Sequence, residues 1–393
     1  MERVARRSRS AGAKLIDSPD SGTFFALPDG SVRFDSLEPL ESDTMTRPWM
    51  RTLAVVGVTG FAAIIAARSA VRQSRRFSFA GKTVIICGGS RGLGLVLARQ
   101  LVDERARVVI CARTKADLEA AAEELRQRGG DVLSIPCDVS DEDQVKTMVG
   151  EALQHFGAID VLFNVAGIIE VGPLDSMTRE DFQLSMDTHF WGALNTSLAV
   201  LPVMRDRGWG RIVNIASLGG KRAVPHMLPY CASKFALVGL SNGLRTELAK
   251  DGILVTTICP SLMRTGSPRN AIFKGQHRKE YAWFSIGDSL PMAAMSAEKA
   301  ARQILRACQN GDAEVIVANP TNVGVAFQSL FPGLTGAVLT WADRLLPEMG
   351  GIGQRGVRGY DSESAWSPSV LTTLTDKAAH DNNEMRSHSL KRV

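Results

Sequence analysis

Residues 83–94 read Thr-Val-Ile-Ile-Cys-Gly-Gly-Ser-Arg-Gly-Leu-Gly, an apolar run that passes directly into a glycine-rich turn. The β-branched residues of the run favour a buried strand. From residue 93 onward, apolar residues recur at three- and four-residue spacing, which indicates a helix. Glycines between a strand and a helix let backbone N–H groups at the helix N-terminus approach a pyrophosphate closely. The stretch therefore predicts a nucleotide-binding strand–turn–helix unit.

Further apolar runs follow along the chain and alternate with amphipathic segments such as 93–101 and 141–156. Such alternation is typical of a parallel sheet that is covered by helices on both faces. The expected fold class is α/β, a Rossmann-type doubly wound parallel sheet of seven strands, with ligands at the carboxyl ends of the strands. The expected strands are residues 83–87, 107–111, 132–135, 159–163, 211–215, 254–258 and 314–317.

The end of the second expected strand bears on the choice of cofactor. Sites that prefer NAD place an acidic residue about 20 residues beyond the glycines, but residues 111–115 read Cys-Ala-Arg-Thr-Lys and the next acidic residue is Asp117. Arg113 can bind a 2′-phosphate through two hydrogen bonds, and Arg91 in the glycine turn supplies a second cation. Exposed arginines without a ligand are the alternative. We expect NADP(H), with NAD(H) less favoured.

Ser217 is followed thirteen residues later by the pattern Tyr230-x-x-x-Lys234. On a helix, positions i and i+4 share a face, so Tyr230 and Lys234 are expected to point the same way. A free tyrosine has a pKa of about 10, and a nearby ammonium lowers that pKa toward the working range. Ser217 can donate a hydrogen bond to a substrate oxygen on which charge develops. The pattern indicates acid–base catalysis at a carbonyl or hydroxyl group.

With these motifs in this order, residues 77–319 resemble the short-chain dehydrogenase/reductase family in its compact form. The resemblance implies a Rossmann fold and hydride transfer between a nicotinamide and a substrate, with Ser217, Tyr230 and Lys234 as catalytic residues. The residues expected to bind the cofactor are Gly88, Ser90, Arg91, Gly92, Leu93, Gly94, Arg113, Asp138, Val139, Asn164, Ala166, Gly167, Tyr230, Lys234, Pro260 and Thr265.

Several of these roles come from the resemblance alone. It places Asp138 at the adenine ring and makes Asn164 part of a motif that steadies the sheet and the cofactor. Lys234 binds the nicotinamide ribose, and Pro260 and Thr265 belong to an element near the nicotinamide.

Three positions depart from the family pattern. His189 stands where the family has a catalytic asparagine that helps hold a water between the lysine and solvent. A histidine there either relays protons, since its pKa lies near neutrality, or fills the space, and we count His189 among the candidate catalytic residues. Ser261 replaces the glycine of a Pro-Gly element, and Cys87 replaces the threonine that often opens the glycine turn.

The predicted function is that of an NADP(H)-dependent oxidoreductase that interconverts a carbonyl and an alcohol, with Tyr230 as the acid–base. The insert 261–296 is a candidate lid and favours a lipophilic substrate, although it can also be a helix pair packed on the core. Its large apolar residues are Phe273, Tyr281, Trp283, Phe284, Met292 and Met295. A reductase of a polar or acyl-carrier substrate and a non-catalytic NADP(H)-binding sensor or scaffold are the alternatives. A homo-oligomer is expected from the resemblance.

Residues 1–50 lack sustained periodicity and are expected to form a disordered leader. The uncharged run 53–67 precedes several arginines and lies in a predicted apolar helix, 51–76. It fits a membrane anchor over residues 53–71, with the catalytic domain on the cytoplasmic side. The alternatives are a helix packed on the protein, which makes the protein cytoplasmic, and a cleaved signal, which a start at Met45 would favour.

The composition excludes several other classes of protein. The net charge is +5 over 393 residues, and the basic residues form no single stripe, so no nucleic-acid partner is expected. The six cysteines show no ligand spacing, which indicates reduced structural thiols and no metal site. After the catalytic domain, we expect a helical extension over 320–350 and a disordered tail over 351–393.

Overall fold

The computed structural model describes residues 63, 65–290, 294–317 and 331–385, together with three short strands nearer the N-terminus. Within the unit formed by residues 69–393 lies a seven-stranded sheet with strand order β14-β10-β9-β7-β4-β5-β6. Every neighbouring pair in this sheet is parallel, so the predicted doubly wound fold is confirmed. The strands are β4 (Thr83–Cys87), β5 (Arg107–Ala112), β6 (Asp131–Pro136), β7 (Val161–Asn164), β9 (Gly210–Ile215), β10 (Ile253–Pro260) and β14 (Glu314–Val317).

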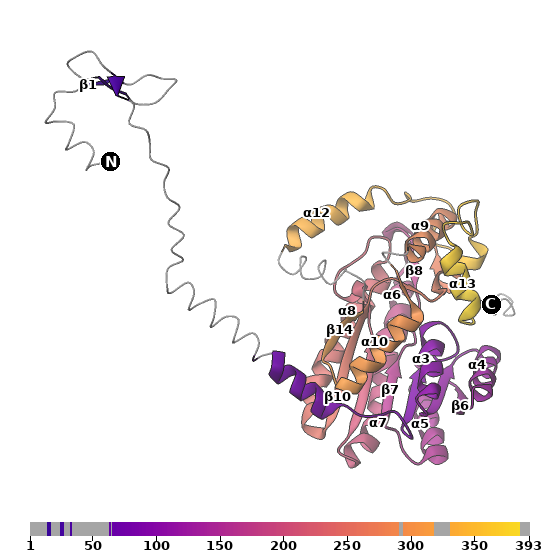
Figure 1. Ribbon diagram of the computed structural model, residues 1–393. Helices are drawn as coiled ribbons and strands as arrows, with labels where there is room; N and C mark the ends of the chain where they lie inside the picture. Colours follow the sequence, from indigo (N-terminus) through magenta and orange to yellow (C-terminus); the bar gives the residue numbers. More distant parts are fainter. Residues whose placement is uncertain are drawn as a thin grey trace. The chain divides into compact units, whose positions relative to one another are not determined.

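Helices cover both faces of the sheet (Figure 1), and each face has its own apolar core. One face packs against α3 (Gly92–Asp103), α4 (Lys115–Gln127) and α10 (Ala297–Asn310). The other face packs against α5 (Glu142–Phe156), α7 (Gly192–Asp206) and α8 (Leu228–Leu248). Because the strands are buried on both sides, their sequences are continuous apolar runs.

Strand order reverses between β4 and β7, and this reversal positions the site. Chain segments leave the two neighbouring strands toward opposite faces, which opens a crevice at their carboxyl ends. The glycine turn follows β4 directly, and the stretch from Asn164 to Gly167 ends β7 and follows it. The turn residues predicted to bind the cofactor therefore lie at the reversal point.

The insert after β10 folds into small elements beside the carboxyl ends of the strands. These are β11 (Met263–Arg264), η5 (Ser267–Asn270), β12 (Ile272–Phe273), α9 (His277–Ser289) and β13 (Met295–Ser296). The side chains of Phe273, Tyr281 and Phe284 are buried together in a separate apolar cluster with Val171 and Met227. The aromatic residues that suggested a lid are therefore packed into a core of their own.

The C-terminal region contradicts the prediction of a disordered tail over 351–393. Residues 351–385 form β15 (Val357–Arg358), η6 (Gly359–Asp361) and α13 (Thr373–Asp381), and β15 pairs with β12. In Figure 1, α13 lies close to α9, and Ser289 Oγ donates to Thr375 Oγ1 at 2.7 Å. The prediction failed because this segment is held through polar and small residues, which leave no apolar periodicity to detect.

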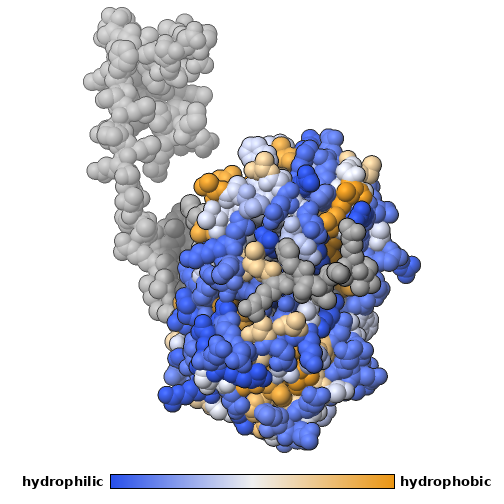
Figure 2. Space-filling view, turned by 90° about the vertical axis from the view of Figure 1, so that its right-hand side faces the viewer, coloured by the Kyte–Doolittle hydropathy of each residue, from blue (hydrophilic) through white to orange (hydrophobic). Residues whose placement is uncertain are grey.

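The extension predicted over 320–350 contains α12 (Pro332–Asp343). Residues 318–330 and 386–393 lie outside the described part of the chain. The face of the molecule in Figure 2 is mostly hydrophilic, and its apolar residues form small separate groups.

The N-terminal unit, residues 1–68, contains a small antiparallel sheet with strand order β1-β2-β3. Its strands are β1 (Lys14–Ile16), β2 (Phe24–Ala26) and β3 (Val32–Arg33), so the prediction of a leader without structure is wrong for these residues. The rest of the leader and most of the apolar run 53–67 lie outside the described residues. Where the chain is described, no helix has both the length and the apolar character to cross a membrane.

Candidate active site

A cavity of about 280 Å³ lies at the carboxyl ends of the central strands. Residues that line it follow β4, β5, β6, β7 and β9 or end β10, as the doubly wound topology requires. All the predicted site residues line this cavity except Asn164, which lines a smaller neighbouring cavity together with His189. Asn164 is instead held beneath the site, where its Nδ2 donates to Asn214 Oδ1 at 2.9 Å and its Oδ1 accepts from Thr196 Oγ1 at 2.7 Å.

The glycine turn passes too close to neighbouring backbone for any side chain at two positions. A Cβ at Gly94 would collide with the carbonyl oxygen of Gly88, and a Cβ at Gly88 would lie 2.7 Å from the backbone nitrogen of Ala166. Gly88 also has a φ of +91°, in the region that favours glycine. The turn thereby passes directly against the backbone that follows β7, and the N-terminus of α3, which comes next, can attract an anion.

Ser217 and Tyr230 both line the cavity and are neighbours there. Ser217 follows β9, and its Oγ accepts from the backbone N–H of Gly219 at 2.9 Å, which leaves its own hydrogen for donation. Tyr230 lies in the first turn of α8, and a hydrogen bond joins its hydroxyl to Ser217. Burial raises the pKa of Tyr230 to about 12, and the Ser217 contact opposes that shift. Tyr230 is therefore a phenol at neutral pH, and the expected lowering of its pKa toward neutrality by the Lys234 ammonium is wrong.

Lys234 lies one helical turn after Tyr230, as the spacing predicted. Its Nζ donates to the carbonyl oxygen of Ile215 at 2.9 Å and lies 5.7 Å from the centroid of the Tyr230 ring. Only 4% of Lys234 is exposed, and burial lowers its pKa to about 7. The amine is thus held near the phenol with its charge readily lost.

His189 lies in a π-helical turn, Asp187–Trp191, just before α7. Its Nε2 accepts from the backbone N–H of Ile168 at 3.1 Å, so Nε2 carries no proton and the hydrogen is on Nδ1. Nδ1 lies 2.7 Å from Ser233 Oγ, and Ser233 Oγ donates to the carbonyl oxygen of Tyr230 at 2.9 Å. Burial holds the pKa of His189 well below its usual value, and the charge of Lys234 adds to the effect. Both ring nitrogens therefore have protein partners and the ring is neutral.

At the far end of the cavity, Arg113 and Asp138 face each other across the ends of β5 and β6. Arg113 Nη1 lies 3.9 Å from Asp138 Oδ2, and about half of the Arg113 side chain is exposed. Asp138 Oδ1 accepts from both the backbone nitrogen and the hydroxyl of Ser140. A half-exposed guanidinium whose ion pair with Asp138 is as long as 3.9 Å can turn toward a phosphate.

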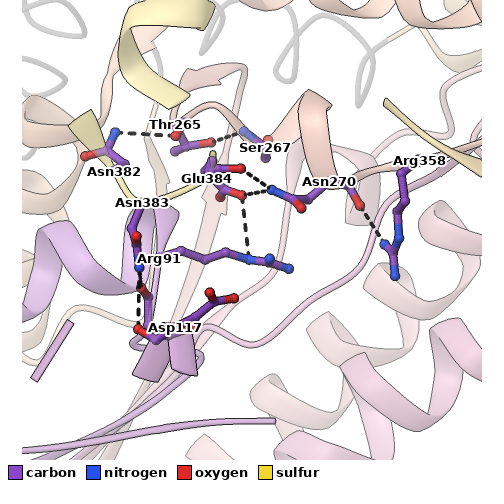
Figure 3. Close-up of polar contacts among 10 residues, drawn as sticks. Arg91, Asp117, Thr265, Ser267, Asn270, Arg358, Asn382, Asn383 and Glu384 are labelled. Atoms are coloured by element: carbon purple, nitrogen blue, oxygen red, sulfur yellow. Dashed lines mark hydrogen bonds and ion pairs between the residues drawn. The ribbon is translucent and has the colours of Figure 1, made fainter. Parts of the chain in front are cut away.

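The sequence did not reveal that the C-terminal region also reaches this cavity. Glu384 lines it, and its Oε2 lies 3.6 Å from Arg91 Nε (Figure 3). Asn383 Nδ2 donates to the carbonyl oxygen of Ser90 in the glycine turn at 2.9 Å. No local sequence signal connects residues 383–384 to the glycine turn, because the two segments are almost 300 residues apart.

The residues present fit a phosphorylated dinucleotide along the length of the cavity. The glycine turn gives a close-approach surface, Arg113 stands where a 2′-phosphate would need a cation, and Lys234 and Tyr230 stand at the other end. The main support for this fit is the geometry at Gly88 and Gly94, where any Cβ would collide with neighbouring backbone atoms.

The chain is similar to known proteins in sequence and in structure. A sequence profile described as short chain dehydrogenase matches residues 82–272. The ketoacyl reductase HetN of Nostoc sp. is 38% identical over 180 residues, which are 46% of this chain and 63% of HetN, less than two thirds of its length. The putative oxidoreductase SadH of Mycobacterium tuberculosis is 33% identical over 246 residues, 61% of this chain and 87% of SadH. A crystal structure of a variant of the actinorhodin polyketide ketoreductase with NADPH has a TM-score of 0.55 and 29% identity, covering 62% of this chain and 98% of that one.

Proposed function

Because the chain belongs to the short-chain dehydrogenase/reductase family, we propose that it is an NADP(H)-dependent reductase that converts a carbonyl group into an alcohol. The observation that carries this proposal is the joint placement of Ser217, Tyr230 and Lys234 at one end of a cavity whose other end holds Arg113. The ketoreductase with NADPH that is similar in structure supports the choice of cofactor.

In this mechanism Tyr230 donates the proton that the carbonyl oxygen needs. With a pKa raised to about 12, Tyr230 is protonated at neutral pH and is ready to act as the acid in reduction. When bound, the cofactor supplies a hydride to the carbonyl carbon. One hydride and one proton convert the carbonyl into the alcohol.

Ser217 and Lys234 assist through hydrogen bonding and charge. The Ser217 hydroxyl, whose oxygen already accepts from Gly219, donates toward the substrate oxygen as negative charge develops there. Lys234 stabilises the tyrosinate left after proton transfer and can bind ribose hydroxyls with its remaining donors.

His189 acts in this proposal as a positioning residue. Since its pKa is lowered, the ring stays neutral near pH 7, and its one N–H proton is engaged by Ser233 while Nε2 accepts from Ile168. It fixes Ile168 at the cavity wall and, through Ser233, the start of α8 that carries Tyr230. Of the two interpretations of His189, a space-filling and orienting role is therefore favoured over a proton relay.

For the substrate we propose a lipophilic carbonyl compound. Support comes from the apolar side chains of Ile168, Ile169 and Met263 in the lining of the cavity. The similarity to proteins named ketoacyl reductases favours a second candidate, a 3-oxoacyl group on a carrier. Measuring kcat/KM for a panel of long-chain ketones and 3-oxoacyl thioesters separates the two candidates, because each candidate predicts the highest kcat/KM for its own class of substrate.

The proposal is tested by NADPH oxidation with the full chain and the Tyr230→Phe variant. We expect Tyr230→Phe to lower kcat by about 10²–10⁴-fold, whereas the Kd for NADPH, measured by fluorescence, should change far less. Tyr360→Phe is the matched control, because Tyr360 does not line the cavity, and it should retain activity. Tight NADPH binding without turnover of any carbonyl or alcohol would instead favour a non-catalytic binding protein.

A further inference from the structure

Residues Asn382–Glu384, the C-terminal turn, lie directly on the N-terminus of α3 (Figure 3). The backbone N–H of Gly92, the first residue of α3, donates to the carbonyl oxygen of Asn382 at 2.9 Å. The Glu384 carboxylate is so close that a Cβ on Gly92 would lie 2.7 Å from Glu384 Oε1. A carbonyl oxygen and a carboxylate thus take up the place where this helix N-terminus would receive an anion.

Side chains from two other parts of the fold hold the C-terminal turn in place. Asn270 Nδ2 donates to the backbone oxygen of Glu384 at 2.9 Å and to Glu384 Oε2 at 2.5 Å. From α3, Arg99 Nη1 donates to Asn382 Oδ1 at 3.1 Å and Arg99 Nη2 to the backbone oxygen of Asp381 at 2.9 Å. Only 5% of Glu384 is exposed. These hydrogen bonds hold the C-terminal turn in a defined position against the glycine turn that precedes α3.

The chemistry of this contact imitates that of a phosphate. Helix N–H groups and a guanidinium are the donors that bind pyrophosphate in such folds, and here Gly92 and Arg91 face oxygen atoms of the C-terminal turn. Burial raises the pKa of Glu384, while Arg91 and Asn270 oppose that shift. A pyrophosphate and the Glu384 carboxylate are both anionic and need the same donors, so they cannot occupy this position together.

We propose that the C-terminal turn is an autoinhibitory segment that occupies the pyrophosphate position and must be displaced before the dinucleotide binds. The proposal rests on the proposed function, since it assumes that the cavity receives NADP(H). Only those molecules in which the turn is displaced can bind the dinucleotide. The apparent Kd is therefore the intrinsic Kd divided by the displaced fraction. Weakening the turn should tighten cofactor binding without changing any of the residues predicted to bind the cofactor.

The test measures the Kd of the full chain for NADPH by fluorescence titration. Variants are Glu384→Gln, which removes the charge, and a chain ending at Asp381, which removes the turn but keeps α13. We expect both to lower the Kd by about tenfold, corresponding to a seated-to-displaced ratio of about 10:1. Asp381→Asn is the matched control, because its carboxylate lies against His380 and not against the glycine turn, and its Kd should equal that of the wild type.

Hydrogen exchange gives a second readout that does not depend on activity. Saturation with NADP⁺ should increase exchange in peptides covering residues 382–385 of the wild type, because the turn leaves its seat. Equal Kd values in all variants together with unchanged exchange would overturn the proposal and leave the proposed function standing. A weaker Kd in Glu384→Gln would also overturn it, because the turn would then hold the cofactor. If neither the wild type nor any variant binds NADPH, the proposed function fails, and this proposal with it.

Discussion

His189 Nδ1 and Ser233 Oγ are 2.7 Å apart, and this contact ties the π-helical turn before α7 to the second turn of α8. Both side chains are almost fully buried. Ser233 Oγ in turn donates to the carbonyl oxygen of Tyr230. The orientation of the catalytic phenol therefore depends on a neutral imidazole that is connected to Tyr230 through Ser233. A π-helical turn at such a place is typical of functional sites.

Replacing His189 should therefore affect geometry more than proton transfer. His189→Ala leaves the Ile168 N–H without its acceptor, at a cost of roughly 1–3 kcal/mol, and should lower both Tm and kcat. His189→Asn can restore an acceptor and should recover part of each. The measurement is kcat/KM for NADPH-dependent reduction from about pH 5 to 8, the range in which a histidine with an ordinary pKa titrates. If His189→Asn lost a limb of the wild-type pH profile, a proton relay would replace the positioning role.

The sheet and the catalytic set could be predicted from the sequence because their signals are local. The expected strands 83–87 and 314–317 coincide with β4 and β14, and the others differ by one or two residues at their ends. Short apolar runs that are rich in β-branched residues and bounded by turn signals are typical of buried strands, and the Tyr-x-x-x-Lys spacing depends only on helix geometry. These features need no knowledge of distant contacts.

The C-terminal turn could not be predicted for the opposite reason. Its partners Ser90, Gly92 and Asn270 are distant in sequence, and each is joined to the turn by only one or two polar hydrogen bonds among the described residues. Polar residues without periodicity are also typical of disordered segments. The sequence also leaves the role of His189 open between proton relay and space filling, because that role depends on which backbone N–H reaches its ring.

Lys234 should give the reduction reaction a pH dependence near neutrality. Burial lowers its pKa to about 7, so the ammonium is present below that pH and is lost as the pH rises through it. If the charge is needed to stabilise the Tyr230 phenolate, kcat/KM should fall above about pH 7 by up to tenfold per pH unit, since this ratio reports groups of the free enzyme. A profile that stays flat through mildly alkaline pH would show that Lys234 keeps its proton. Lys250→Met, at an exposed lysine, is the control and should retain the wild-type profile.

Arg113 should determine the preference for NADPH over NADH. A hydrogen-bonded charged pair contributes roughly 1.5–3 kcal/mol, so Arg113→Ser should raise the KM for NADPH by about 10–150-fold and leave the KM for NADH almost unchanged. Arg126→Ser removes an exposed arginine near the C-terminal end of α4 and should change neither value. Equal losses with both cofactors would mean that Arg113 supports the fold of the site and not the 2′-phosphate.

Asp288 on α9 should make the folded state less stable at alkaline pH. It is 4% exposed, its Oδ2 has no hydrogen-bond partner in the described part of the chain, and burial raises its pKa to about 8, against the opposing effects of Arg264 and Thr375. An unfolded aspartate has a pKa of about 3.9. Between these two values the folded state binds the proton and the unfolded state does not, so the free energy of unfolding falls as the pH rises from about 4 to 8.

Asp288→Asn removes this penalty because the amide carries no charge to bury. We expect the variant to have the higher Tm at about pH 8, by roughly 2–4 °C for each kcal/mol recovered, and to approach the wild type at about pH 4, where the unfolded state also begins to bind the proton. Thermal unfolding at the two pH values provides the measurement. Asp343→Asn, at a carboxylate that is 55% exposed on α12, should shift Tm little at either pH. A gain of equal size at both pH values would show that the substitution stabilises by better packing, since only an ionisation penalty disappears when the aspartate is protonated.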